Sequence, residues 1–191
     1  MKPALLLIDL QNDFLGAKGL EPAAGMVVER AHRVLDCARK SSVPVIHVWT
    51  TVHAPGQDLD TRMPHWKRAN KWSCVAGTTG HETPLELRAL TDETIVHKRF
   101  FSAFESGALD EVLKARGIDT LILAGVHEHG CIRAAVLDAY ARGFRVLVAE
   151  DAIGSDDALH SAITKRYLEQ RAAQYLPVES LISLFNRTAA T

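Results

Sequence analysis

The sequence has few cysteines, little net charge and no long apolar run. Its 191 residues carry a formal net charge of −1, so the chain lacks the basic character of proteins that bind nucleic acids or anionic membranes. No apolar stretch approaches the roughly 20 residues that a membrane-spanning helix needs. The apolar run at residues 4–8 meets Asp9 too early for a signal peptide. These absences predict a cytoplasmic protein that binds neither nucleic acid nor membrane.

Cysteine is scarce, and its three copies lie far apart. Cys37, Cys74 and Cys131 form neither a C-x-x-C pair nor the dense pattern of a disulfide framework. Each cysteine therefore needs an explanation by packing or by reactivity. A chain of this length buries a substantial core as one unit, so we expect a single domain over residues 1–191.

Short apolar runs alternate with amphipathic segments along the chain, as expected for buried strands and surface helices. Strands are predicted at 3–9, 43–50, 93–98, 119–126 and 144–151, with an edge strand at 175–178. Helices are predicted at 22–41 and 108–116, with Cys131 in the first turn of the next, then over 156–173 with Ser155 as its cap, and at the C-terminus. Residues 52–83, rich in Pro, Gly, Thr and His, are predicted to form a long loop.

This alternation predicts a three-layer, doubly wound α/β fold. The sheet is expected to be mostly parallel, with about six strands and helices on both faces, because strand–helix–strand crossovers are right-handed and lie over the sheet. Such sheets bind ligands in the crevice beyond the carboxyl ends of their strands. Residues at those ends are therefore the candidates for a functional site.

Three chemically distinct side chains arrive at that edge. Asp9 ends the first strand, Lys98 ends the third, and Cys131 follows the fourth at a helix start. A helix N-terminus and a nearby ammonium both lower the pKa of a thiol, and the thiolate is the attacking form. The aspartate is suited to move the thiol proton, and backbone N–H groups at the helix start are suited to hold an oxyanion. The combination favours covalent catalysis of acyl transfer.

Each of these residues also has a more ordinary interpretation when it is taken alone. An aspartate after a strand is commonly a turn residue, a lysine at a strand end is commonly solvated, and a free cysteine is commonly inert and buried. Only the joint position of Asp9, Lys98 and Cys131 at one edge of the sheet favours a catalytic role.

Four segments in order resemble the isochorismatase-like cysteine hydrolases. The segment "LLLIDLQNDFL" (5–15) resembles the opening strand and D-x-Q-x-D-F turn of that family, and "GTTGHETPLEL" (77–87) is similar to its G-T-x-G-x-E segment. Residues 96–126 follow its lysine, S-A-F and G-hydrophobic pattern, and residues 131–152 resemble its nucleophile helix and the next strand. The resemblance spans residues 4–152 almost continuously.

The resemblance implies a role for each candidate. Asp9 is expected to be the general base and acid, Lys98 the cation that stabilises the thiolate, and Cys131 the nucleophile. A cis peptide bond between Val126 and His127 is expected to turn backbone N–H groups, including those of His127 and Cys131, into an oxyanion hole. The resemblance implies no cofactor, and it implies assembly as a homodimer or homotetramer.

The turn before the nucleophile departs from the family pattern. Glu128 replaces the usual threonine, and we expect it to shape the turn or orient the substrate, with a solvated loop carboxylate as the alternative. His127 and His129 flank it, and an H-x-H pattern on a tight turn is more often a pair of local hydrogen-bonding residues than a metal site.

A second departure concerns metal binding. Nicotinamidases of this family hold a metal through an Asp-x-His motif and a further histidine, but Thr51 replaces that aspartate here, leaving His53 and His65. Two neutral ligands without a carboxylate make a weak site, so we expect no metal.

The sequence therefore predicts a cysteine hydrolase that cleaves the C–N bond of a small amide, carbamoyl or ureido compound through a thioester, with release of ammonia. Candidates for the pocket wall are Phe14, Trp66, Trp72 and Phe104, with Phe100 beside them, although core packing is the commoner role of such rings. Two alternatives stay open. One is an isochorismatase-type vinyl ether hydrolase, and the other is a non-catalytic relative that binds small molecules or senses thiol chemistry.

Overall fold

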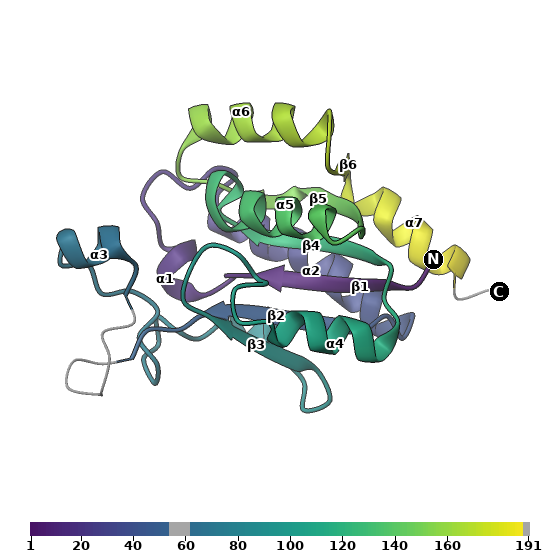
Figure 1. Ribbon diagram of the computed structural model, residues 1–191, viewed down its shortest axis with the longest axis horizontal. Coiled ribbons are helices and arrows are strands. Elements are labelled where there is room, and N and C mark those ends of the chain that lie inside the picture. The colour runs from purple at the N-terminus through teal and green to yellow at the C-terminus, as the bar shows by residue number, and fades with distance from the viewer. Residues whose placement is uncertain (54–61, 189–191) are drawn as a thin grey trace.

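One all-parallel sheet of six strands organises the molecule. The computed structural model describes residues 1–53 and 62–188. The strands lie in the order β3-β2-β1-β4-β5-β6 (Figure 1). Their bounds are β1 (Pro3–Ile8), β2 (Val45–Thr50), β3 (Thr94–Lys98), β4 (Thr120–Val126), β5 (Arg145–Gly154) and β6 (Gln174–Leu176). Every predicted strand is present, and the predicted doubly wound α/β fold is confirmed.

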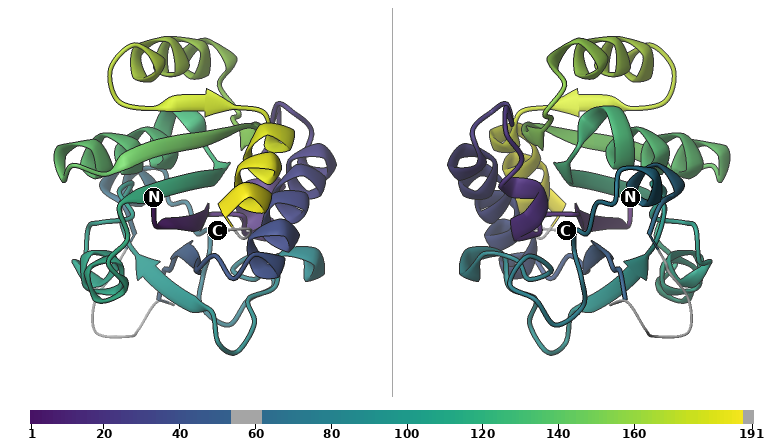
Figure 2. Two further views of the ribbon diagram at one scale, coloured as in Figure 1. Left: turned by 90° about the vertical axis from the view of Figure 1, so that its right-hand side faces the viewer. Right: turned by 90° about the vertical axis from the view of Figure 1, so that its left-hand side faces the viewer.

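Helices cover both faces of this sheet. The longer helices are α2 (Ala24–Lys40), α4 (Ala108–Arg116), α5 (Arg133–Ala141), α6 (Ala158–Glu169) and α7 (Val178–Thr188). Short turns of helix are α1 (Asn12–Leu15), α3 (Pro64–Arg68), η1 (Leu85–Leu87) and the π-helical turn η2 (Glu128–Ile132). Figure 2 shows α2 and α7 on one side of the sheet and α4 and α5 on the other. The result is a helix–sheet–helix sandwich with two cores.

Strand β1 contributes to both cores in alternation. Leu5 and Leu7 pack in the core beneath α2 and α7, and Leu6 and Ile8 pack in the core beneath α4 and α5. All four side chains are buried. A strand covered on both faces has no solvent-facing position, which explains why this segment is a continuous apolar run rather than an alternating one.

Several predicted boundaries are wrong. Strand β5 continues to Gly154, and Ser155 forms backbone hydrogen bonds with Glu21 in place of capping a helix. The cap of α6 is Asp157, whose side chain accepts a hydrogen bond of 2.9 Å from the backbone N–H of His160. The predicted loop at 52–83 contains α3, while residues 54–61 lie outside the described part of the chain.

The strand order determines where along the sheet a ligand-binding crevice is expected. From β1 the chain first builds outward through β2 and β3, then returns to the other side of β1 with β4, so the order reverses between β1 and β4. In parallel sheets this reversal opens a crevice beyond the carboxyl ends of the strands. Asp9 follows β1 at that point, and the turn that carries Cys131 follows β4.

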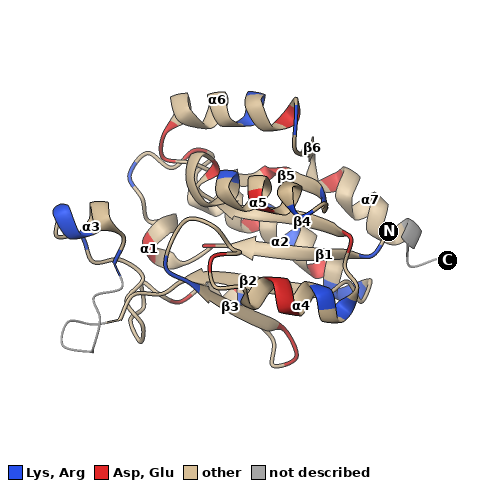
Figure 3. Cartoon of the chain, viewed as in Figure 1, with Lys and Arg blue, Asp and Glu red and all other residues tan. Residues whose placement is uncertain are grey.

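Charged residues are dispersed over the outside of the sandwich. Figure 3 shows acidic and basic residues interspersed along the outer helices, and α4 carries both signs. Among the described residues, no helix is both long and apolar enough to cross a bilayer.

Gly125, next to the end of β4, allows the two central strands to approach closely. Its φ is +145°, and a Cβ at this position would lie 2.0 Å from the carbonyl oxygen of Ile8. We predict that Gly125→Ala destabilises the protein by about 3 kcal/mol or more, because both backbone conformation and space oppose a side chain. Urea unfolding measures this effect.

Gly25 in α2 provides the matched control, because a Cβ there meets nothing within 4 Å. Gly25→Ala should change the free energy of unfolding by no more than about 1 kcal/mol, towards greater stability. Equal effects of the two substitutions would contradict the assigned close approach of β1 and β4.

Candidate active site

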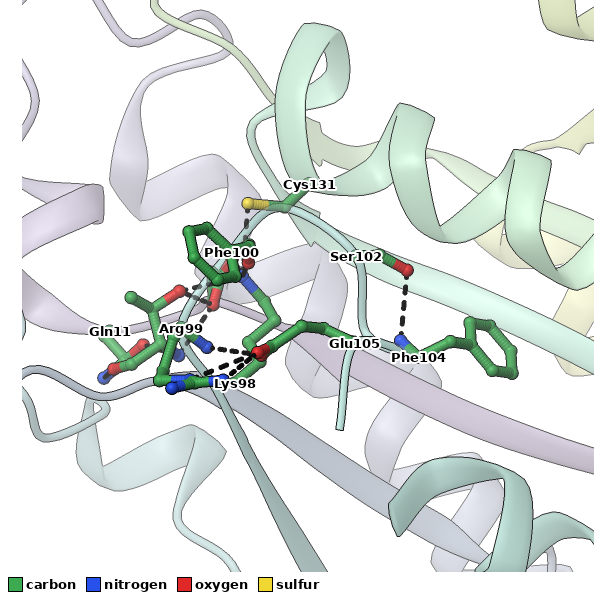
Figure 4. A network of polar contacts seen from close by, with 10 residues as sticks. Gln11, Lys98, Arg99, Phe100, Ser102, Phe104, Glu105 and Cys131 are labelled. Carbon is green, nitrogen blue, oxygen red and sulfur yellow. Dashed lines mark hydrogen bonds and ion pairs between the residues drawn. The ribbon is translucent and has the colours of Figure 1, made fainter. Parts of the chain in front are cut away.

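The structure brings the three predicted catalytic side chains together. Asp9 follows β1, Lys98 is the last residue of β3, and Cys131 lies in the π-helical turn after β4. The Lys98 ammonium lies 2.8 Å from Asp9 Oδ2 and donates a hydrogen bond of 3.3 Å to Cys131 Sγ (Figure 4). Residues from positions 9, 98 and 131 thus meet around one ammonium group.

The ammonium group is fixed by further contacts. It donates to the hydroxyl of Thr50 at 2.8 Å and to the carbonyl oxygen of Phe100 at 2.9 Å. The Thr50 hydroxyl in turn donates to Asp9 Oδ1 at 2.9 Å, and the Thr50 backbone N–H donates to the same oxygen at 3.0 Å. Lys98 is 1% exposed, and Asp9 and Thr50 are fully buried. Buried charges need such pairing, and the network gives both side chains a fixed orientation.

Gln11 ties this network to the next loop. Its side-chain amide accepts from the Thr50 backbone N–H at 2.9 Å, and it donates to the carbonyl oxygens of Thr50 at 3.0 Å and His81 at 2.8 Å. Asp9 itself has a positive φ of 55°, a conformation that aspartate tolerates better than most residues. The sequence reasoning assigned no role to Thr50 or Gln11, although Gln11 stands two residues after Asp9.

The Lys98 ammonium lowers the pKa of the Cys131 thiol, as predicted, but other influences outweigh it. Burial, together with the neighbouring Asp9 carboxylate, raises the pKa of Cys131 to about 12, and the Lys98 ammonium only partly opposes this. Burial alone would lower the pKa of Lys98, but Asp9 and Cys131 hold it above its ordinary value. Cys131 is therefore a neutral thiol at rest, beside a charged lysine–aspartate pair.

Cys131 lies at a cavity of about 220 Å³. Two of the predicted wall residues line this cavity, Phe14 and Trp66, whose ring centroids are 6.1 Å apart. Both rings are almost completely buried. A cavity of this size, with aromatic walls and a few polar groups, suits a substrate smaller than a typical drug molecule.

The other predicted wall residues lie elsewhere. Trp72 packs against the core beneath α2, with the Arg62 guanidinium 3.8 Å from its ring centroid. Phe104 packs in the opposite core, and Figure 4 shows its ring turned away from Cys131. Phe100 reaches the site only through its carbonyl oxygen, while its side chain is 42% exposed.

Glu128 also points away from the cavity. It is 7% exposed, so the solvated-loop alternative is wrong, and its carboxylate accepts a hydrogen bond from the hydroxyl of Ser161 in α6. Its charge contributes, after burial, to raising the pKa of Tyr175 in β6. These contacts support the predicted role in shaping the turn, because they attach the first residue of η2 to neighbouring elements.

A polar wall of the cavity was missed from the sequence. It consists of Lys71, His127, His129 and Asp156. His129 Nδ1 lies 2.6 Å from the Ser155 hydroxyl, and His127 Nδ1 lies 3.1 Å from Asp156 Oδ1. The histidines therefore make local contacts, as predicted, but they also face the ligand space. The signal in the sequence was the H-x-H pattern itself, which ends two residues before Cys131.

Comparison with known proteins assigns the chain to a family. The model of the isochorismatase domain matches residues 3–180. The chain belongs to the isochorismatase family. Its sequence is 31% identical over 163 residues to a maleamate amidohydrolase of Pseudomonas putida, covering 80% of this chain and 72% of the relative. The structure superposes on an N-carbamoylsarcosine amidase of Thermoplasma acidophilum with a TM-score of 0.78, 29% identity and coverage of 93% and 97%.

These relatives support a hydrolase of amides, but another relative carries a name that marks it as probably inactive. A probable inactive nicotinamidase of Arabidopsis thaliana is 35% identical over 155 residues, covering 78% of this chain and 79% of the relative. Family membership therefore does not decide the activity by itself, and the activity has to be inferred from the residues of the site.

The residues at the position of the nicotinamidase metal site do not fit a metal ion. The Thr51 hydroxyl lies within 2.9 Å of His81 Nε2 and 2.8 Å of His97 Nδ1. His53 lines that side of the molecule, whereas His65 stacks on Phe101 beside the Cys131 cavity. Among the described residues, no group of three or more His, Cys, Asp and Glu side chains is arranged to hold a metal.

The protonation state of Cys131 gives a prediction for alkylation. With a thiol pKa of about 12, the rate of iodoacetamide labelling of Cys131 should rise about tenfold per pH unit from about pH 7 to about pH 10 without levelling. Peptide mass mapping follows Cys131 separately from the other two cysteines.

The variant Asp9→Asn tests whether the Asp9 carboxylate contributes to the raised pKa of Cys131. Removal of the carboxylate charge should lower the pKa of Cys131, so labelling in Asp9→Asn should level off at a lower pH than in the unmodified protein. A plateau below about pH 9 in the unmodified protein, or no downward shift of the plateau in Asp9→Asn, would contradict the neutral resting thiol.

Proposed function

We propose that this protein is a cysteine hydrolase that cleaves the C–N bond of a small amide, carbamoyl or ureido compound and releases ammonia. The observation that carries this proposal is the contact of the buried Lys98 ammonium with both Asp9 and Cys131 beside an aromatic cavity. An inert buried cysteine needs neither a buried lysine nor a buried aspartate, and burial of both charges is costly.

Proton transfer from the thiol begins the reaction. Asp9 Oδ2 lies beside the Lys98 ammonium, and the Asp9 carboxylate also acts directly on the Cys131 thiol, whose pKa it raises. Asp9 is therefore placed to accept the thiol proton. Transfer of this proton to Asp9 as sulfur attacks the substrate carbonyl avoids a free thiolate at rest, and the charge of Lys98 stabilises the sulfur as it becomes negative.

The developing oxyanion requires backbone donors. The peptide bond between Val126 and His127 is cis, and η2 begins directly afterwards. We assign the backbone N–H groups of His127 and Cys131 to the oxyanion hole, a type of donor whose removal typically costs 10²- to 10³-fold in rate. Collapse of the tetrahedral intermediate expels the amine, which takes the proton from Asp9 and leaves as ammonia. Water then hydrolyses the thioester.

The two other functions receive less support from the site. Vinyl ether hydrolysis of the isochorismatase type proceeds by proton transfer and has no use for a thiol at the cavity. A thiol-sensing role is disfavoured because redox-sensing cysteines have low pKa values and are accessible, whereas Cys131 is 5% exposed and has a raised pKa.

Ammonia release from a panel of small amides, carbamoyl and ureido compounds tests the proposal. We expect turnover of at least one compound, with a loss of about 10⁴-fold or more in Cys131→Ala, because the nucleophile is absent. Activity should survive exhaustive chelation.

Cys37→Ala provides the matched control, because this cysteine lies in α2, in contact with Asn186 and far from the cavity. It should release ammonia at the rate of the unmodified protein. Retained activity in Cys131→Ala, or a carbonyl product from a vinyl ether in that variant, would overturn the proposal. Loss of activity on chelation would favour the nicotinamidase chemistry instead.

A further inference from the structure

His127 lies on the cavity side of the nucleophile, where the sequence placed only its backbone. We propose that the His127 side chain, oriented by Asp156, is the general base that activates water for hydrolysis of the thioester. This inference rests on the proposed function, since it assigns the second half of that reaction. It concerns a histidine that stands in a turn where this chain departs from the family pattern.

Geometry places the pair at the ligand space. His127 follows the last residue of β4 and lines the same cavity as Cys131. Its side chain is 14% exposed, and the edge-on contact with Phe14, at 5.7 Å between ring centroids, holds the ring. Asp156 comes from the segment before α6 and also lines the cavity.

The contact with Asp156 favours the His127 tautomer that carries its proton on Nδ1. His127 Nδ1 is 3.1 Å from Asp156 Oδ1, and this buried nitrogen makes no aligned hydrogen bond in the described part of the chain. Asp156 is 39% exposed, and the same Oδ1 lies 3.9 Å from His129 Nε2. A proton on Nδ1, directed at the carboxylate, leaves the lone pair on Nε2, as in other carboxylate–histidine pairs. Such catalytic contacts often tighten only when substrate is bound.

Asp9 is poorly placed for this second step. It is fully buried, its Oδ1 accepts two hydrogen bonds from Thr50, and its Oδ2 lies against Lys98. His127 and Cys131 both line the cavity through which water reaches the sulfur, whereas Asp9 is not among the lining residues. His127 meets the water on the open side, so the two bases divide the reaction between them.

The surroundings of His127 favour its neutral form, which can act as a base. Burial lowers its pKa, Asp156 and Asp9 act to raise it, and His129 and Lys71 act to lower it further, with a net effect below the ordinary histidine value. The ring is therefore neutral at neutral pH and able to accept a proton.

The step balances without another reactant. Nε2 of His127 takes one proton from water as the water oxygen bonds to the thioester carbonyl carbon. The C–S bond then breaks, the acid product leaves with the second water proton, and the Cys131 sulfur recovers the proton from Nε2. The free thiol and neutral histidine are restored.

Rapid-quench measurement of ammonia separates the two half-reactions, using a compound from the panel that the unmodified protein turns over. We expect His127→Asn to release about one equivalent of ammonia per chain in a burst, followed by a steady state about 100-fold slower than that of the unmodified protein. Asn keeps the backbone N–H and a similar size.

Asp156→Asn should show a smaller loss. Because Asp156 raises the pKa of His127, its removal should also shift the acid limb of the rate profile to lower pH, which a purely structural effect would not do. If His127→Asn fails to fold, the pH profile of Asp156→Asn tests the role of His127 in its place. His32→Asn is the control, because His32 lies in α2 and contacts the backbone carbonyl oxygen of Glu86, outside the cavity, and it should behave as the unmodified protein.

A steady state without a burst in His127→Asn, or equal slowing of the first and later turnovers, would overturn the role of His127 while leaving the proposed function intact. Absence of ammonia from every compound in the unmodified protein would instead overturn both.

Discussion

The ammonium group of Lys98 is almost completely shielded from solvent, so protein groups have to balance its charge. Asp9 balances it directly, and Thr50 and the Phe100 carbonyl oxygen complete its hydrogen bonds. Loss of one partner from a buried pair typically costs 3–5 kcal/mol, because the other charge is left uncompensated. The pair and its hydrogen bonds thus join the ends of β1, β2 and β3, and they bring a carboxylate and an ammonium to the side of Cys131.

The same pair explains why the thiol is held neutral. The Asp9 carboxylate raises the pKa of Cys131 and the Lys98 ammonium lowers it, so the two charges oppose each other and burial is the largest influence. In the proposed mechanism the nucleophile is formed during attack rather than stored as a thiolate. A neutral, little-exposed thiol is also protected from oxidation, which proceeds through thiolate character and exposure.

The elements and their order could be predicted because their cause is local. Short apolar runs such as 3–9 and 119–126 predict buried strands. In a parallel sheet the carboxyl ends of these strands lie at the same edge. Side-chain direction around the cavity could not be predicted in this way. Trp66 and Trp72 are six residues apart in one segment, yet only Trp66 lines the cavity, since that choice depends on packing against distant elements.

The remaining errors have the same origin. A helix start lowers a thiol's pKa, but the size of the opposing burial depends on how closely β4, η2 and the 99–104 segment pack around Cys131. Ser155 resembles a helix cap in sequence, but its backbone pairs with Glu21, 134 positions earlier in the chain, and the cap moves to Asp157. His127 and His129 form a recognisable motif in the sequence, and only the fold shows that they line the same cavity as Cys131.

The central claim is that Cys131 forms a covalent bond to the acyl part of the substrate. Intact-mass analysis of the protein, acid-quenched during its first turnover with a compound that yields ammonia, tests it most directly. The account predicts an added mass equal to the acyl group, mapped by digestion to the peptide that contains Cys131 and absent from Cys131→Ala. Ammonia release with no adduct at any quench time, in His127→Asn as well as in the unmodified protein, would contradict it.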